Sequence, residues 1–263
     1  MRRRKFIKTA GAAGVGFTFF PAFSQETTTA VSNVGEDLDL YAVLDLLEES
    51  KNLEEFEKAL NSEEKGINNL DLNEDGEVDY IKVEETVEEN THLIVLQVEI
   101  EENDFQDVAT IEIEKKAEDD ISVQAVGAEE FYGEDYIVEP VTEKTETTTT
   151  VVHVHTWPLI LFIFRPRYSP WRSPWRWRAR PLWWRPWRPI ARATYRNHWA
   201  RSARRSRYRR TKTRRSSRSR NMYKTQRKTS KKYQKSKKPV TTQKKGTTQK
   251  QQPKKQQQKK KRP

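Results

Sequence analysis

Cysteine is missing from all 263 positions of the sequence. Its absence excludes a disulfide framework, a thiolate zinc site and a cysteine nucleophile. Apolar residues are also scarce, because they make up 34% of the chain against 33% for charged residues. Much of such a chain cannot bury enough apolar surface to offset the entropy that is lost on ordering. We therefore expect one folded part of modest size, held by ordinary packing or by a metal.

Acidic residues are missing from the whole second part of the chain. All 38 Asp and Glu lie between Glu26 and Glu146, where only seven Lys or Arg accompany them. The other basic residues lie within the first eight positions or after Val151, although the net charge of the whole chain is only +12. Blocks of opposite charge indicate two modules that bind separate partners or that bind each other.

Long apolar runs are missing as well. The runs at residues 10–20 and 157–164 fall short of the roughly 20 residues that a membrane-spanning helix needs. Residues 1–24 resemble a twin-arginine export signal, because Arg3 and Arg4 precede a short apolar run and small residues precede Gln25. We expect a signal that is removed on export to the periplasm or cell envelope; the alternative is an uncleaved anchor. Residues 25–36 would form a flexible lead.

Residues 37–140 combine the periodicities of helices and strands. Apolar residues recur at steps of three and four over residues 37–50 and again after Asn52, which is suited to cap a helix. From residue 78 the period becomes that of strands, at 78–87, 93–98, 105–114 and 121–125, with an edge strand at 136–138. Two helices followed by such a run predict an acidic α+β domain with a small antiparallel sheet.

Oxygen-bearing side chains recur at every second residue between the predicted helices and strands. Gly76 lies where a tight loop needs a positive φ, which glycine adopts without steric cost. The pattern resembles the first nine places of an EF-hand calcium loop, although the twelfth place, a bidentate Glu in that family, is Lys82 here. The side chains expected at this weak or incomplete calcium site are Asp71, Asn73, Asp75, Glu77 and Asp79.

Two interpretations of this loop remain open. Either a calcium ion fixes the junction of helix and sheet, or the loop is a polar turn held by its own side chains. In the first case a carboxylate from elsewhere, such as Glu84, Asp104 or Asp107, would replace the ligand that Lys82 does not supply. The loop leads from a helix into a strand, whereas an EF-hand loop connects two helices.

The amino-acid sequence of residues 68–81, followed by those of 93–98, 105–112 and 136–140, resembles sequences in a group of uncharacterised exported bacterial proteins. The resemblance covers roughly residues 38–190 of this chain. It implies an exported protein with this domain, and it implies no activity.

Tryptophan and proline are concentrated in one part of the basic half. All eight Trp and seven of the twelve Pro lie within residues 157–199, after a Thr-rich linker at 141–156. Repeated proline argues against a regular helix and favours an extended or polyproline II chain. Residues 200–263 hold Arg, Lys, Ser and Gln with almost no aliphatic residue. We expect this basic tail to be disordered.

The Trp/Arg/Pro-rich segment has three interpretations. Indole rings and guanidinium groups suit an anionic lipid or envelope polyanion. Stacked aromatic and basic residues also suit single-stranded nucleic acid, which an exported protein meets less readily. The third interpretation is an intramolecular contact with the acidic domain through ion pairs and cation–π contacts.

No catalytic triad order, phosphate-binding glycine loop or nucleotide motif is present in the sequence. We therefore expect a non-enzymatic, membrane-associated envelope protein; the alternative is polyanion or nucleic-acid binding through the basic segment and tail. The residues expected to carry the surface contact are Trp171, Arg172, Trp175, Arg176, Trp177, Arg178, Trp183, Trp184, Arg185, Trp187 and Arg188.

Overall fold

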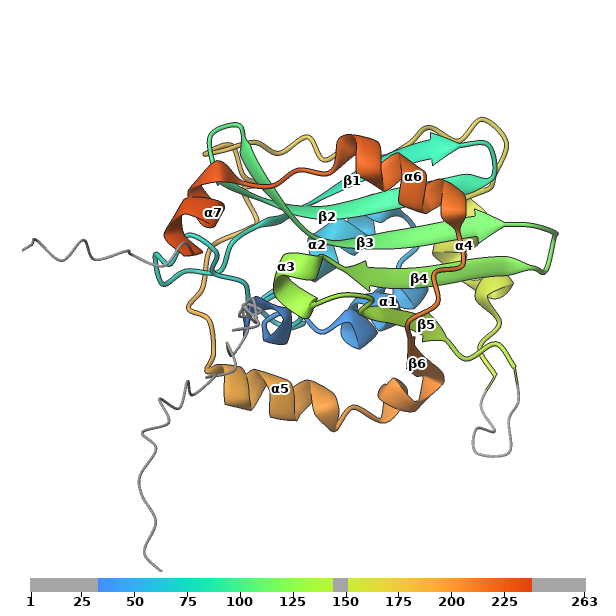
Figure 1. The fold of residues 1–263 in the computed structure, drawn as a ribbon, viewed down its shortest axis with the longest axis horizontal. Helices are drawn as coiled ribbons and strands as arrows, with labels where there is room; N and C mark the ends of the chain where they lie inside the picture. Colours follow the sequence, from blue (N-terminus) through green and yellow to red (C-terminus); the bar gives the residue numbers. More distant parts are fainter. Residues whose placement is uncertain (1–32, 144–150, 238–263) are drawn as a thin grey trace, which may run out of the picture. The chain divides into compact units, whose positions relative to one another are not determined.

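The computed structural model describes residues 33–143 and 151–237. Within them, six strands form one antiparallel sheet in which the strands lie side by side in sequence order (Figure 1). The predicted α+β class, with helices followed by an antiparallel sheet, is confirmed. The strands are β1 (Ile81–Glu88), β2 (Thr91–Glu101), β3 (Asp104–Lys115), β4 (Ile121–Gly127), β5 (Ile137–Pro140) and β6 (Tyr208–Thr211).

Two capped helices precede the sheet, as predicted. α1 (Leu40–Glu49) begins after Asp39, whose side chain accepts hydrogen bonds from two backbone N–H groups of the first turn. α2 (Leu53–Leu60) begins after Asn52, whose side chain accepts the N–H of Glu55. The other helical pieces are η1 (Asn33–Glu36), α3 (Glu129–Tyr132), η2 (Val154–Thr156), α4 (Pro158–Ile163), α5 (Arg192–Ala200), η3 (Ala203–Arg207), α6 (Ser217–Gln226) and α7 (Lys231–Lys237).

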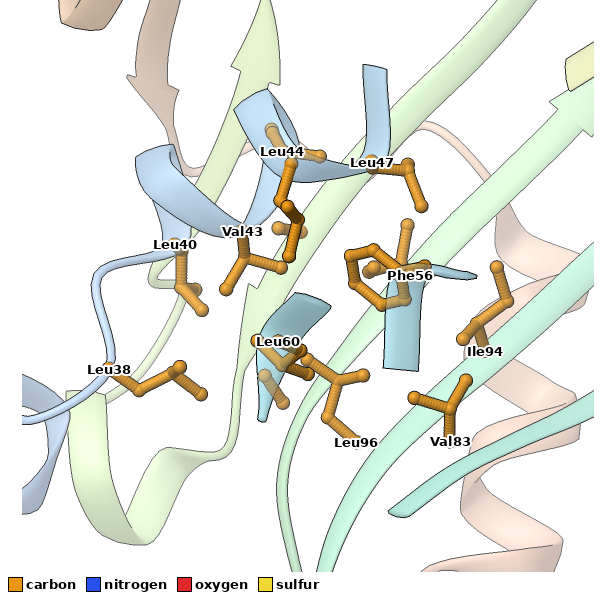
Figure 2. Packing of buried hydrophobic residues seen from close by; sticks show 14 of the residues in the cluster. Leu38, Leu40, Val43, Leu44, Leu47, Phe56, Leu60, Val83, Ile94 and Leu96 are labelled. Atoms are coloured by element: carbon orange, nitrogen blue, oxygen red, sulfur yellow. The ribbon is translucent and has the colours of Figure 1, made fainter. Parts of the chain in front are cut away.

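The main core lies between α1, α2 and one face of the sheet. Alternate residues of each strand point to this face, and the apolar side chains at these positions are buried. Each fully buried Leu, Ile or Phe contributes about 1.5–3 kcal/mol to this packing. Figure 2 shows the centre of the cluster, where Leu38 and side chains of the two helices meet those of β1 and β2. The helix and strand residues labelled there are Leu40, Val43, Leu44, Leu47, Phe56, Leu60, Val83, Ile94 and Leu96.

The second face of the sheet is polar and is nevertheless buried. α6 crosses it, with Met222 packed on Leu93 and Val95 of β2 (Figure 1). β2 is therefore covered on both faces, as its nearly continuous apolar sequence predicted. The buried polar side chains that the strands place on this face include Lys82, Gln97, Glu99, Asp107, Thr110, Glu112 and Gln124.

The prediction of a disordered tail is wrong for residues 200–237. These residues form the end of α5, η3, β6, α6 and α7, and β6 adds a sixth strand to the sheet. They are ordered because their cations pair with carboxylates of the sheet and because β5 offers an open backbone ladder. Consequently β5 is an inner strand of the sheet and not the predicted edge strand. Residues 238–263 lie outside the described residues.

Three other predictions are changed by the structure or lie outside it. Within the predicted linker, residues 144–150 lie outside the described residues, and η2 follows them. Two short helices, α4 and α5, occupy the ends of the Trp/Arg/Pro-rich segment, because α4 carries its only proline at the first position and α5 carries none. The predicted signal and most of the flexible lead, residues 1–32, also lie outside the described residues.

Candidate functional site

The oxygen-rich loop is closed by its own side chains. Asp71 accepts the backbone N–H of Asp75 at 3.1 Å and that of Gly76 at 3.0 Å. Asn73 accepts the N–H of Asp75 at 3.0 Å, and Asp75 accepts the N–H of Glu77 at 2.9 Å. Gly76 has the predicted positive φ of 84°. The side-chain oxygens therefore gather on the inner side of a tight polar turn.

Asp79 closes this turn from the sheet side, where it accepts the N–H of Leu72 at 2.6 Å. Burial raises the pKa of Asp79 from its ordinary value of 3.8 to about 7, and the nearby charges of Asp71 and Asp75 raise it further. The carboxyl groups of Asp71, Asp75 and Asp79 therefore lie close enough to influence one another, with Asp75 exposed and Asp79 partly buried.

The ligand set for calcium is incomplete among the described residues, where no group of three or more His, Asp or Glu side chains is arranged to hold a metal ion. Lys82, at the twelfth place of the loop pattern, lies in β1 with its ammonium 3.7 Å from Glu84. Two other carboxylates considered as replacements, Asp104 and Asp107, bind backbone N–H groups of the C-terminal residues. Each carboxylate oxygen of the loop still has a lone pair for a cation, so the residues fit calcium in chemistry but lack a bidentate ligand.

Residues 165–191, here called the Trp–Arg segment, run along the outer edge of β1. The N–H of Glu85 donates to the carbonyl of Trp171 at 2.9 Å, and the N–H of Ser173 donates to the carbonyl of Val83 at 3.1 Å. Further on, the N–H of Val78 donates to the carbonyl of Trp187 at 2.8 Å. The segment is therefore held against the sheet and covers an edge that would otherwise attract other strands. Of the three interpretations of this segment, the structure thus has the intramolecular contact with the acidic domain.

Glu57 of α2 binds the Trp–Arg segment through its buried carboxylate. It is 2% exposed, and it accepts hydrogen bonds from the Trp171 indole N–H at 2.9 Å and the Ser173 hydroxyl at 2.6 Å. The hydroxyl of Tyr80 donates to the same carboxylate at 3.0 Å. Burial raises the pKa of Glu57, while these three donors act to lower it.

A second buried carboxylate, Glu85 of β1, holds the start of the segment. It accepts the backbone N–H of Trp171 at 2.8 Å and the hydroxyl of Tyr168. On its other side lies the Nδ1 atom of His92 at 2.7 Å. Both carboxylate oxygens of Glu85 thus have partners, and they tie the start of the segment to β1 and β2.

A cavity of about 410 Å³ lies where the oxygen-rich loop meets the Trp–Arg segment. One wall consists of loop side chains and the other of indole and guanidinium groups, with Tyr80 between them. The structure thus brings members of both predicted residue sets together, which the sequence did not indicate. The lining residues are Asn73, Asp75, Glu77, Val78, Asp79, Tyr80, Trp177, Arg178, Arg180, Trp184 and Pro186. We call this space the loop cavity.

Arg180 was not among the predicted residues, yet it is central to the loop cavity. Its guanidinium lies 5.2 Å from the ring centre of Tyr80 and 3.9 Å from Glu99. Burial lowers the pKa of Arg180, although the nearby carboxylates act to raise it. Its Nη1 atom is buried without a hydrogen-bond acceptor, as is the indole Nε1 of Trp184. No signal in the sequence separates Arg180 from the other arginines of the segment.

The basic half of the chain divides into two parts by its ion pairs. In the Trp–Arg segment only Arg180 forms an ion pair within the described residues, and that pair is long. Eleven of the Lys and Arg in the described residues 191–237 are instead paired with the acidic domain, as in the contacts of Arg209 and Arg215 with Glu139 at 2.8 and 2.9 Å. The paired cations are Arg192, Arg196, Arg204, Arg205, Arg207, Arg209, Arg214, Arg215, Arg218, Arg227 and Lys232.

Two adjacent apolar side chains of the Trp–Arg segment, Leu182 and Trp183, are 91% and 45% exposed and directly precede Trp184 of the loop cavity; we call them the apolar tip. Ile190, further along the segment, is 50% exposed. The neighbouring Arg178, Arg185 and Arg188 are exposed and have no carboxylate partner among the described residues. Arg185 instead donates to the carbonyl oxygens of Leu182 and Trp184, which fixes the shape of the tip.

The other predicted surface residues are placed less favourably for an external contact. Trp171 and Arg172 are tied to β1, with Arg172 bridging Glu84 through the backbone. Trp175 and Trp187 are half-buried, and Arg176 pairs with Ala179 through the backbone.

Among the described residues, no helix is long and apolar enough to cross a membrane. Comparison of the chain with protein-family models, with curated proteins and with solved structures gave no match.

Proposed function

We propose that the chain is a non-enzymatic, exported envelope protein that associates with an anionic membrane surface through its apolar tip. The carrying observation is the exposure of Leu182 and Trp183 next to arginines that no carboxylate of the described residues neutralises. Leucine and tryptophan enter the interface between head groups and acyl chains, while arginine attracts anionic head groups. The sequence composition predicted a membrane contact over residues 171–188. We now propose that residues 178–190 make this contact.

Association with vesicles tests this proposal. Full-length chain is sedimented with vesicles of phosphatidylglycerol and phosphatidylcholine over a salt series. We expect binding that weakens with salt and that falls about tenfold when Leu182→Gln removes the exposed aliphatic side chain from the interface. Leu161→Gln is the matched control, because Leu161 is 63% exposed on α4, outside the tip.

Two results would contradict the proposal. Equal loss of binding in both leucine variants would show that the tip has no special role. Binding to single-stranded DNA that is stronger than binding to the vesicles, with the same dependence on salt, would favour the polyanion alternative.

We further propose that the oxygen-rich loop is a weak calcium site. The supporting observation is its conformation, in which Gly76 turns the chain and the side chains of Asp71, Asn73 and Asp75 gather their oxygens on one side. A site without a bidentate carboxylate belongs at the weak end of the calcium range, with a dissociation constant of about 10⁻⁴–10⁻³ M. Such a site would fill only where calcium is plentiful.

Calorimetric titration of the full chain with calcium tests the loop. We expect a heat of binding that disappears in Asp71→Ala and Asp75→Ala, because both substitutions remove an oxygen ligand. Glu118→Ala, an exposed acidic position in the turn between β3 and β4, serves as the control for general charge loss. Heat that persists in all three variants would leave the loop as a polar turn.

A further inference from the structure

The two walls of the loop cavity carry opposite charge. Asp75, Glu77 and Asp79 lie on the loop wall, and Arg178 and Arg180 lie on the wall made by the Trp–Arg segment. Because the walls are not joined by an ion pair among the described residues, each side is left to attract its own counter-charge. A ligand with one positive and one negative group matches this arrangement better than a simple anion or cation does.

The basic wall provides hydrogen-bond donors that have no acceptor. Arg180 Nη1 and Trp184 Nε1 are both buried and unpaired within the described residues, which leaves a desolvation penalty for each. The side chain of Arg180 is 16% exposed, so water reaches it only in part. Guanidinium and indole N–H groups suit a phosphate oxygen, and guanidinium binds phosphate in a bidentate manner.

The acidic wall is suited to an ammonium group. Glu77 is exposed and its side chain has no partner among the described residues, so its carboxylate is free to accept. The indole ring of Trp177 also lines the cavity, and an ammonium is attracted to the face of an aromatic ring. The cavity, at about 410 Å³, is within the range of small-ligand sites.

We infer that the loop cavity binds a phosphoamine zwitterion, a phosphate ester carrying a short alkylammonium, with the phosphate at Arg180 and Trp184 and the ammonium at Glu77. The inference rests on the proposed membrane association for the source of the ligand, which would be the head group of phosphatidylethanolamine. The apolar tip supports this source, because Leu182 and Trp183 directly precede Trp184 and would bring the cavity to the level of the head groups.

Calorimetry with three soluble probes tests the cavity itself. Full-length chain is titrated with O-phosphoethanolamine, inorganic phosphate and ethanolamine, in the presence of a calcium chelator because the loop carboxylates serve both sites. We expect O-phosphoethanolamine to bind at least tenfold more tightly than either single-charge probe. Equal affinity for inorganic phosphate would overturn the inference and leave a plain anion site.

Variants of each wall sharpen the test. Arg180→Gln should weaken O-phosphoethanolamine binding by about tenfold or more, whereas Arg167→Gln, an exposed arginine of the same segment outside both the cavity and the tip, should leave it unchanged. Glu77→Gln should weaken O-phosphoethanolamine without weakening phosphate. If Arg180→Gln does not fold, Trp184→Phe removes the N–H and keeps an aromatic ring. Unchanged affinity in Trp184→Phe and Glu77→Gln would refute the assignment of the two walls.

Vesicles separate this inference from the proposed function. Adding phosphatidylethanolamine to the anionic vesicles should strengthen binding in the native chain and not in Glu77→Gln. Leu182→Gln should lose vesicle binding while it keeps the soluble probe. A chain that binds the probe but no vesicle would refute membrane association and assign the cavity to a phosphoamine that is free in solution.

Discussion

Glu57 lies inside the protein, although burying a carboxylate without partners costs several kcal/mol. The cost is offset by donors that come from outside its own helix, namely the Trp171 indole and the Ser173 hydroxyl. Such a partnership is directional, because an indole N–H can satisfy only an acceptor at one place. Glu57 therefore fixes which residues of the Trp–Arg segment lie against α2, and so fixes where the loop cavity forms.

Asp107 of β3 makes the stability of the fold depend on pH. It is buried, and burial raises its pKa from 3.8 to about 6, against the positive charges of Lys228 and Arg227. The folded protein holds this proton more tightly than the unfolded chain does, so the stabilisation is complete below pH 4 and is lost as the pH rises through 6. Asp107→Asn should therefore gain stability relative to the native chain between pH 4 and pH 7, on the order of 3 kcal/mol. Urea unfolding at several pH values measures this difference.

Asp104, three residues away, provides a control of opposite sign. Burial acts to raise its pKa, but hydrogen bonds from the Ser230 hydroxyl and from the N–H groups of Lys232 and Lys231 outweigh burial and hold the pKa below 3.8. Its stabilisation is present at neutral pH and is lost as the pH falls. Asp104→Asn should lose stability at pH 7 and less at pH 3. Parallel pH profiles for the two variants would contradict this account.

At the scale of elements, ion pairs help to attach β6, α6 and α7, and in β6 the ladder with β5 and the buried Tyr208 add to them. Arg214 pairs with buried Glu112, Arg209 and Arg215 pair with Glu139, and Lys232 pairs with Glu101. Apolar support is small, since Met222 and Tyr233 are the only buried large apolar side chains that the described residues of α6 and α7 contribute. These elements should therefore be more sensitive to ionic strength than the strands beneath them.

Hydrogen exchange tests this difference between elements. The range of charge interactions falls from about 10 Å at 0.1 M salt to about 3 Å at 1 M, so raising the salt should speed exchange in β6, α6 and α7. Amides of β2 and β3 should keep their protection, because they are held by the apolar core. Exchange that accelerates equally in all five elements would show that the sheet and its cover unfold as one unit.

The helices and the first strands could be predicted because their signals are local. Asp39 and Asn52 cap the helices, and the apolar residues of 93–98 mark a strand whatever surrounds them. β6 (Tyr208–Thr211) could not be predicted in this way, because two of its four residues are arginines. It forms a strand because β5 provides the backbone partners and Glu139 accepts a hydrogen bond from Arg209. The composition of a segment gives the amount of apolar surface in that segment. It does not show which other segment provides the hydrogen-bond and ion-pair partners.

The candidate site was predicted in parts and not as a whole. The spacing from Asp71 to Asp79 marked the loop, and the composition marked Trp177, Arg178 and Trp184. That these groups share one cavity depends on the backbone contact between Val78 and Trp187, which joins residues more than a hundred positions apart. Spacing along a sequence carries no information about such a contact.

At the scale of the whole molecule, the two charge blocks largely meet each other. The acidic residues of 33–143 carry far more negative charge than their own lysines can balance, and the cations after Ile190 supply the counter-charge. The surplus cations of the Trp–Arg segment, which no carboxylate of the described residues neutralises, are left for an outside partner. A basic composition thus serves two purposes within one half of the chain.

The pairing of β5 with β6 also sets an order of events during synthesis. Glu139 and Arg209 are separated by 70 positions, and a chain made from its N-terminus exposes the first long before the second leaves the ribosome. Until then the growing polypeptide carries an open strand and an uncovered polar face, and long-range strand pairing is slow to form. A translation product that ends before residue 208 would therefore be the aggregation-prone species, because it lacks the strand and the two helices that cover what was made before them.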